Sequence, residues 1–264
     1  MKGVEKLLEA IDKMLAQSRR MLKRRSLQAI EGEMEQAWAA FFQRQGAAFL
    51  SLFAQLQGEF AEAITEADWA SRFRAVSGAT DEFEALLIRL AGAAMLAGAA
   101  DGARAIGMAV SFDLNNPRAV EYLRRYGAEL VTKIGEETRE RLRALIARGT
   151  SEGWSYGKMA GEIAKAFEGF TRKRGRLIAI TELGNAYEFG NFWVIKGLQG
   201  QGLEMEKYWS TMGDERVSDL CRGNEADDWI LLDQEHSSGH LHPLGHPACR
   251  CDELYRRVNP QVSF

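Results

Sequence analysis

Four side chains near the C-terminal end of the chain are of the types that bind zinc. They are Cys221, His246, Cys249 and Cys251. Thiolate sulfur and imidazole nitrogen are the ligands that tetrahedral Zn²⁺ prefers, and four of them make a closed structural site. The spacing His-x-x-Cys-x-Cys places three candidate ligands on one tight loop, which Cys221 would reach from elsewhere. The sequence therefore predicts a structural zinc site; the alternative is buried reduced thiols packed around Trp209 and Trp229.

The other three histidines are His236, His240 and His242, and they lie in a loop rich in serine and glycine. Clustered histidines can bind metal or respond to pH. The composition of the loop favours an exposed polar surface, and this is the role that we predict for them.

Carboxylates at Glu182, Asp214 and Glu215 could in principle hold a divalent ion for hydrolysis. Nothing in their spacing forces them together, and the chain has no phosphate-cradling glycine loop. The simpler role for Glu182 is an interior polar anchor that pairs with Arg216 or caps the next loop, because a buried carboxylate requires such a partner. We therefore expect no enzyme activity.

Basic residues are concentrated in two segments. These hold Arg19, Arg20, Lys23, Arg24 and Arg25, and then Arg172, Lys173, Arg174 and Arg176. Residues 1–30 carry eight Lys and Arg against three acids, a net charge of +5, so the remaining 234 residues sum to −8. A basic segment on an acidic body predicts contact with the phosphates of double-stranded DNA, without base readout, or with an acidic protein surface. A solvated helix face is the alternative.

Apolar residues recur at helical spacing along most of the chain, so we expect helices to position these groups. Proline is scarce, with 4 residues, and strong helix formers are abundant. Helices are predicted over 4–15, 26–66, 81–108, 117–149, 155–167 and 173–196. The stretch 26–66 is either an extended hairpin arm or two helices that meet near Gly46. Asn116 and Ser155 are suited to cap two of them, and Pro117 to the first helical position. The spacing Gly98-x-x-x-Gly102 indicates close packing between helices.

The pattern changes after Gly197. Leu203 and Met205 alternate with acidic residues as in a strand, and all the histidines and cysteines follow. The sequence predicts a mainly α fold, with a helical N-terminal region, a helical core and a small mixed α/β C-terminal module. We place the domains at 1–110 and 111–264.

Cysteine usage and hydropathy narrow the class of protein. Three cysteines, all after residue 220, do not make a disulfide framework. No secretory signal is visible, and the longest apolar run, residues 90–100, is too short to span a bilayer. We expect no membrane contact, and a location in the cytoplasm or inside a particle assembled there.

An ordered series of short motifs between about residues 116 and 251 resembles the Mu F-like head morphogenesis family of bacteriophages. Those that carry the resemblance are Asn116-Pro117-Arg118, Gly153-Trp154-Ser155, Ile163-Ala164, Thr181-Glu182 with Asn185, Tyr208-Trp209, Asp214-Glu215-Arg216 and His246-Pro247-Ala248-Cys249-Arg250-Cys251. Two positions depart from the family. Ile180 stands where an Arg is usual, and Ser218 replaces the first Cys of a Cys-x-x-Cys.

The resemblance implies a phage minor head protein that acts in head assembly and in DNA packaging or ejection. Its implied partners are the portal protein, capsid or scaffold proteins and non-specific double-stranded DNA, and its implied location is the virion head, with host cytoplasm during assembly. The implied structural motif comprises Thr181, Glu182, Asn185, Trp209, Asp214 and Arg216. Residues 1–110 lie outside the resemblance. The alternatives are a zinc-stabilised DNA-binding module and, less favoured, a nuclease or a toxin-like effector.

Overall fold

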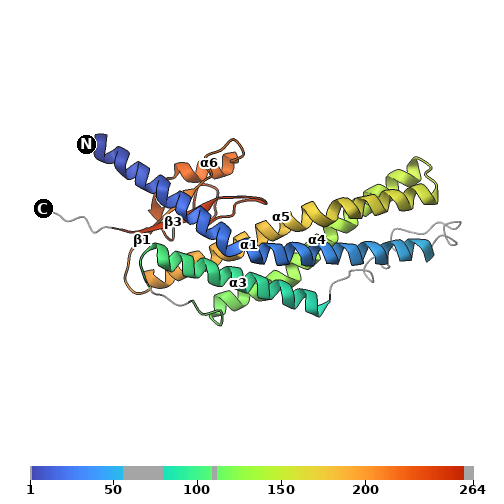
Figure 1. Cartoon of the computed structure of the whole chain (residues 1–264), viewed down its shortest axis with the longest axis horizontal. Helices are drawn as coiled ribbons and strands as arrows, with labels where there is room; N and C mark the ends of the chain where they lie inside the picture. The colour runs from blue at the N-terminus through green and yellow to red at the C-terminus, as the bar shows by residue number, and fades with distance from the viewer. Residues whose placement is uncertain (1, 56–79, 109–111, 259–264) are drawn as a thin grey trace. The chain divides into compact units, whose positions relative to one another are not determined.

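The computed structural model describes residues 2–55, 80–108 and 112–258 (Figure 1). Its helices are α1 (Lys2–Gln55), α3 (Asp81–Ala105), α4 (Pro117–Ser151), α5 (Tyr156–Gln199) and α6 (Asp219–Ala226). Its strands are β1 (Met205–Ser210), β2 (Ile230–Leu231) and β3 (Asp252–Arg257). The predicted class, mainly α with a small mixed C-terminal module, is confirmed.

Two of the predicted helix starts are confirmed in detail. Asn116 Oδ1 accepts the backbone N–H groups of Arg118 (3.1 Å) and Ala119 (2.9 Å), and α4 begins at Pro117. Ser155 Oγ accepts the N–H of Lys158 at 3.3 Å, and α5 begins at the next residue. Each cap supplies an acceptor for an N–H group that has no partner within the first helical turn.

The predicted breaks inside α1 and α5 are wrong, and the part of the predicted helix 26–66 that follows Gln55 lies outside the described residues. The periodic segments before and after residues 16–25 form one helix, and so do those before and after residues 168–172. Both joints interrupt the apolar pattern with polar residues but contain no proline, so the backbone hydrogen bonds of the helix continue through them. A change in which face is apolar therefore does not mark the end of a helix at these positions.

Contacts divide the chain into two compact units. Unit 1 comprises residues 1–32, 90–120 and 177–264, and unit 2 comprises residues 33–89 and 121–176. Each unit contains residues from both sides of position 110, the position of the predicted domain boundary. Unit 2 has its own apolar cluster, which contains Phe49, Leu142, Met159, Ile163 and Phe167.

In unit 1, α3 and α5 approach at backbone distance because glycines line their contact. A Cβ on Gly98 would overlap the carbonyl oxygen of Tyr187, and one on Gly190 would overlap that of Met95. The predicted packing role of Gly98 is therefore confirmed. By length and composition α3 could cross a membrane, but half of its most apolar window is buried in the protein.

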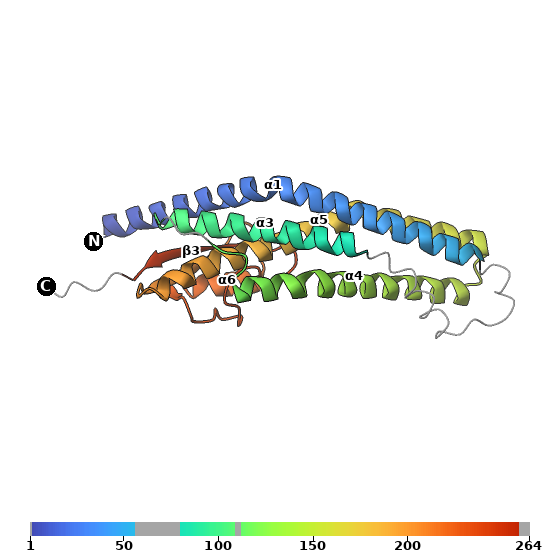
Figure 2. The same ribbon diagram turned by 90° about the horizontal axis from the view of Figure 1, so that it is seen from below.

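The sheet of unit 1 has the order β2-β1-β3, and both pairings are antiparallel. The strand predicted around Leu203 and Met205 is β1, which begins at Met205. Residues Phe192, Ile195 and Leu198 of α5 pack with Met205, Leu232 and Tyr255 in one buried cluster. Figure 2 shows β3 below the N-terminal part of α1. The C-terminal part of α5 thus supports the sheet and the loops that carry the cysteines and histidines.

Candidate metal centre

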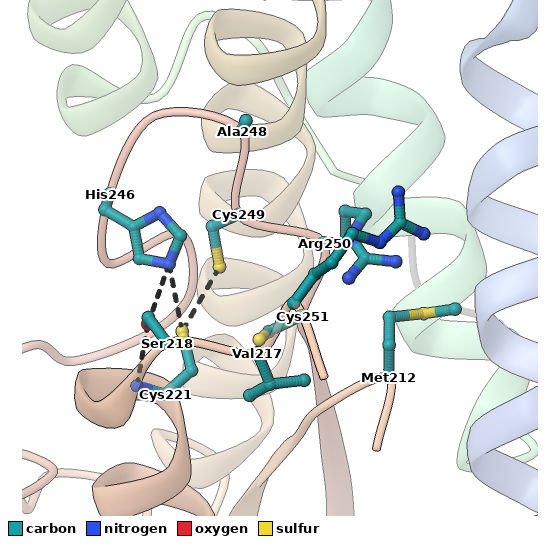
Figure 3. Close-up of a pocket in the computed structure, with 10 residues that line it drawn as sticks. Met212, Val217, Ser218, Cys221, His246, Ala248, Cys249, Arg250 and Cys251 are labelled. Carbon is teal, nitrogen blue, oxygen red and sulfur yellow. Dashed lines mark hydrogen bonds between the residues drawn. The ribbon is translucent and has the colours of Figure 1, made fainter. Parts of the chain in front are cut away.

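Three of the four predicted zinc ligands meet at one point. Cys221 is on α6, and its Sγ lies 3.4 Å from His246 Nε2 and 3.6 Å from Cys249 Sγ (Figure 3). All three ligand atoms lie within 4.8 Å of one another. Zinc bonds of about 2.3 Å to sulfur and about 2.0 Å to nitrogen, in a tetrahedron, separate neighbouring ligand atoms by about 3.5 to 3.8 Å. The donor types and the spacing therefore fit a zinc ion.

The imidazole of His246 is oriented for metal binding through Nε2. Its Nδ1 lies 2.8 Å from the carbonyl oxygen of Pro247, and a carbonyl can only accept, so Nδ1 carries the proton. Nε2 then offers a lone pair, which faces Ser218 Oγ at 3.0 Å as well as Cys221. Ligand histidines commonly donate their other ring N–H to a backbone carbonyl in this way, which fixes the tautomer.

The two ligand thiols differ in how readily they ionise. A hydrogen bond from the Cys251 thiol, with backbone N–H groups of Cys251 and Gly245, lowers the pKa of Cys249 to about 5 against the opposing effect of burial. Burial raises the pKa of Cys221. A metal ion at this site must therefore displace a proton from Cys221, and its affinity should rise with pH.

Cys251, the fourth predicted ligand, lies beside this cluster. Its side chain is buried and interacts with the other two thiols, but its sulfur is outside the group of three mutually close ligand atoms. A cavity of about 20 Å³, lined by all four predicted ligands, has room for one water or ion. The thiols pack around Trp209, as the alternative interpretation expected, whereas Trp229 packs against Tyr208 instead.

A tight turn presents His246 and Cys249 on the same side of their loop. The N–H of Cys249 donates to the carbonyl of His246 at 3.1 Å. Pro247 occupies the first central position, and Ala248 has a φ of +60°, as a type II turn requires at the second. A left-handed alanine is unfavourable, so contacts outside the turn must stabilise it.

Those contacts come from the family-like Thr-Glu motif on α5. Thr181 Oγ1 accepts the N–H of Ala248 at 3.0 Å, and Asn185 Oδ1, one helical turn later, accepts the N–H of Leu244 at 3.3 Å. Between them, the Leu244 side chain lies 2.8 Å from where a Cβ on Gly184 would be. One face of α5 thus holds the loop that carries two of the candidate ligands.

We predict that Thr181→Val lowers the free energy of unfolding by about 1 kcal/mol, because it removes the acceptor of the part-buried hydrogen bond from the N–H of Ala248. Thr181→Ser keeps the hydroxyl and should lower the free energy of unfolding much less. Urea unfolding followed by tryptophan fluorescence measures both. Equal stability of the valine and serine variants would contradict a role for this hydrogen bond.

The remaining motif residues have structural roles. Trp209 is completely buried in β1 and contacts the edge of His236. Asp214 accepts two hydrogen bonds from Arg250, at 2.7 and 2.9 Å, and these hold its pKa well below the usual range. Arg216 donates to the same carboxylate at 3.3 Å, so Asp214 is its partner here, whereas the sequence analysis had considered Glu182. Glu182 is half-buried on α5.

The histidine loop is not the exposed surface that its composition suggested. His236 is buried, with Nε2 at 2.8 Å from Glu253 and Nδ1 at 3.5 Å from Asp227. Burial lowers the pKa of His242 to about 4. The signal that was missed is Glu253, an acid within a buried strand that needs a polar partner.

Three of the five basic residues in the first segment point into unit 1. Arg19 donates to Asn191 at 3.0 Å, Arg20 to the carbonyl of Thr211 at 2.9 Å, and Lys23 to the carbonyl of Cys251 at 3.0 Å. Lys23 also forms an ion pair with Glu188, which is completely buried. Only Arg24 and Arg25 of this segment are fully exposed. Most of the predicted contact segment is therefore held inside the protein.

The second basic segment, in unit 2, also contains both buried and exposed basic residues. Arg174 is buried, donates to Thr138 Oγ1 at 2.9 Å and pairs with Glu137. Lys173 and Arg176 are exposed. The side chain of Arg172 lies outside the described residues.

Sequence reasoning also missed the acidic and amide partners of the first segment. Glu188 and Asn191 are on α5, Asp252 starts β3, and all three are completely buried. Asp101 on α3 accepts hydrogen bonds from Ser26 and Tyr187, both at 2.9 Å. Acidic residues between apolar positions of a core helix were the available signal, because each one requires a buried partner.

The comparisons with known proteins agree with the part of the motif series from Gly153 onward. Residues 140–254 match the family model described as Phage Mu protein F like protein. No curated protein and no solved structure matched the chain. The matched span contains the candidate metal centre and the Thr-Glu motif, and it confirms the resemblance to the Mu F-like head morphogenesis family over these residues.

Proposed function

We propose that the protein is a bacteriophage minor head protein, because residues 140–254 match the family model described as Phage Mu protein F like protein. It associates with the portal or the procapsid interior, acts in head assembly and in DNA packaging or ejection, and resides in the virion head after assembly in the host cytoplasm. The observation that carries the proposal is the match itself, which spans the motif on α5 and the loop that this motif holds.

A structural role fits the chemistry of the motif better than catalysis does. The Asp214 carboxylate accepts hydrogen bonds from Arg250 and Arg216. The side-chain oxygens of Thr181 and Asn185 accept hydrogen bonds from backbone N–H groups of the loop. These groups fix the fold of the C-terminal module, and we propose a protein without enzyme activity.

Zinc is the ion that we propose for the candidate metal centre. Cys221, His246 and Cys249 would hold it, with the fourth position open to a water molecule or to Cys251. Bound zinc would link α6 to the loop before β3, and so stabilise a module with little regular structure of its own.

The exposed basic residues would make the contact with double-stranded DNA or with the acidic surface of a partner. Among the described side chains of the two segments these are Arg24, Arg25, Lys173 and Arg176. Such contact would be electrostatic and insensitive to base sequence.

The proposed function predicts that the protein co-purifies with procapsids or virions at a few copies per particle. Quantitative mass spectrometry of gradient-purified particles, with the major capsid protein as internal reference, measures this ratio. Removing the gene should give particles that lack the protein and show reduced assembly or DNA content. Absence of the protein from both procapsids and virions would contradict the proposal.

A further inference from the structure

Between Ile11 and Leu27, α1 has its polarity reversed relative to an ordinary surface helix. Its inward face carries Arg19 and Lys23, whose charges are met by Asp252 and Glu188. Its outward face exposes five large apolar side chains: Ile11 (43%), Met14 (70%), Leu15 (55%), Met21 (67%) and Leu22 (37%). Surface helices normally place the apolar face inward and the charges outward.

These five residues lie on one face of the helix, on both sides of the exposed Ser18, and we call them the α1 stripe. At 3.6 residues per turn, their positions fall within an arc of about 120° centred near Ser18. Leu27, Arg19 and Lys23 lie on the opposite side, against unit 1. The stripe is therefore not the edge of the core. Contiguous exposed apolar surface of this kind marks a site of interaction.

The charges around the stripe define the chemistry of what covers it. From Ile11 to Arg25 the helix has six basic residues and one acidic residue, Asp12. Three of the basic residues, Arg19, Arg20 and Lys23, are directed into unit 1. Arg24 and Arg25 are exposed at the C-terminal end of the stripe. A second copy of this helix would bring the same positive charge to the contact, whereas a partner with acidic residues beside an apolar face would complement it.

We propose that the α1 stripe docks an acidic amphipathic helix of another protein. The apolar face of the partner covers Met14, Leu15 and Met21, and its carboxylates meet Arg24 and Arg25. The proposal rests on α1 alone and does not depend on the phage role, so either can fail without the other.

The test uses the full chain and a fluorescently labelled synthetic peptide, about four heptads long, with leucine along one face and glutamate along the other. Fluorescence anisotropy should show binding that weakens as salt rises. Met14→Glu/Met21→Glu should weaken it at least about tenfold, because two buried apolar contacts are lost. Arg24→Gln/Arg25→Gln should weaken it less and flatten its salt dependence.

The matched control is Leu177→Glu/Leu231→Glu, which adds the same charge at two exposed apolar positions of unit 1 outside the stripe. It should bind like the wild type. Circular dichroism must show that every variant is folded. Absence of peptide binding by the wild type, or equal binding of a lysine version of the peptide, would overturn the proposal.

Two other results would assign the stripe to a different occupant and would also overturn it. One is a wild-type dimer in light scattering that Met14→Glu/Met21→Glu converts to a monomer. The other is binding to anionic phosphatidylserine vesicles, lost in the same variant, without binding to the acidic peptide.

Discussion

Replacing Cys249 with serine is expected to abolish zinc binding by this protein. The wild type, purified without chelator, should contain about one zinc ion per chain. The Cys221 sulfur lies 3.4 Å and 3.6 Å from the other two donor atoms, and all three lie within 4.8 Å of one another, which suits the ligands of one zinc ion. Cys221→Ser and His246→Gln should lose the metal as well. Elemental analysis of the purified proteins measures this directly. His240→Gln is the matched control, since this histidine bonds to Ser238 away from the cluster, and it should keep full occupancy.

Zinc removal should also destabilise the C-terminal module. A chelator is expected to lower the melting temperature of the wild type and to leave that of Cys249→Ser unchanged, because metal binding free energy contributes to folding. Zinc affinity should increase with pH, since the raised pKa of Cys221 means that binding must displace its proton. Metal-free wild-type protein that is fully folded, with a melting temperature insensitive to chelator, would exclude the zinc site.

The second large effect is expected at the buried ion pair between α1 and α5. Lys23→Met should lower the free energy of unfolding by about 3–5 kcal/mol, because it leaves the Glu188 carboxylate buried without its cation. Glu188→Leu should lower the free energy of unfolding by a similar amount. The double variant should be more stable than the sum of the two losses predicts, since neither charge is then left alone. Urea denaturation followed by circular dichroism measures all three.

Arg24→Met is the control for this cycle. Arg24 is the next residue on α1 but is exposed, so its loss should change stability by no more than about 0.5 kcal/mol. If Lys23→Met unfolds at the same urea concentration as the wild type, the N-terminal part of α1 is not fixed by this pair. The basic segment would then be available as a free arm, as its charge alone suggested.

The local sequence was sufficient to predict the class of fold and several of its boundaries. The caps at Asn116 and Ser155, the start of β1 and the close packing at Gly98 depend on side chains and hydrogen bonds near each position. The continuity of α1 and α5 did not follow from the pattern. A helix that passes from one environment to another changes which face is apolar, and along the sequence this resembles two helices.

For the candidate metal centre, the sequence by itself determined the types of ligand and the turn that presents two of them. His246 and Cys249 are three residues apart, and Pro247 favours the turn between them. Only the tertiary structure decided that Cys221 completes the group while Cys251 lies beside it. That depends on where α6 packs against the loop, which residues about 25 positions away along the chain cannot specify locally.

The limit of prediction from sequence is clearest for the basic residues of α1. The sequence determined that residues 19–25 are basic, but only the tertiary structure decided that Arg19 and Lys23 face inward and the α1 stripe outward. The reason is that a charge can be buried wherever the fold supplies an opposite charge, and Glu188 and Asp252 come from α5 and β3, more than 160 residues away. Periodicity reports the apolar face of a helix. Whether that face meets the core or a partner depends on what the rest of the chain places beside it.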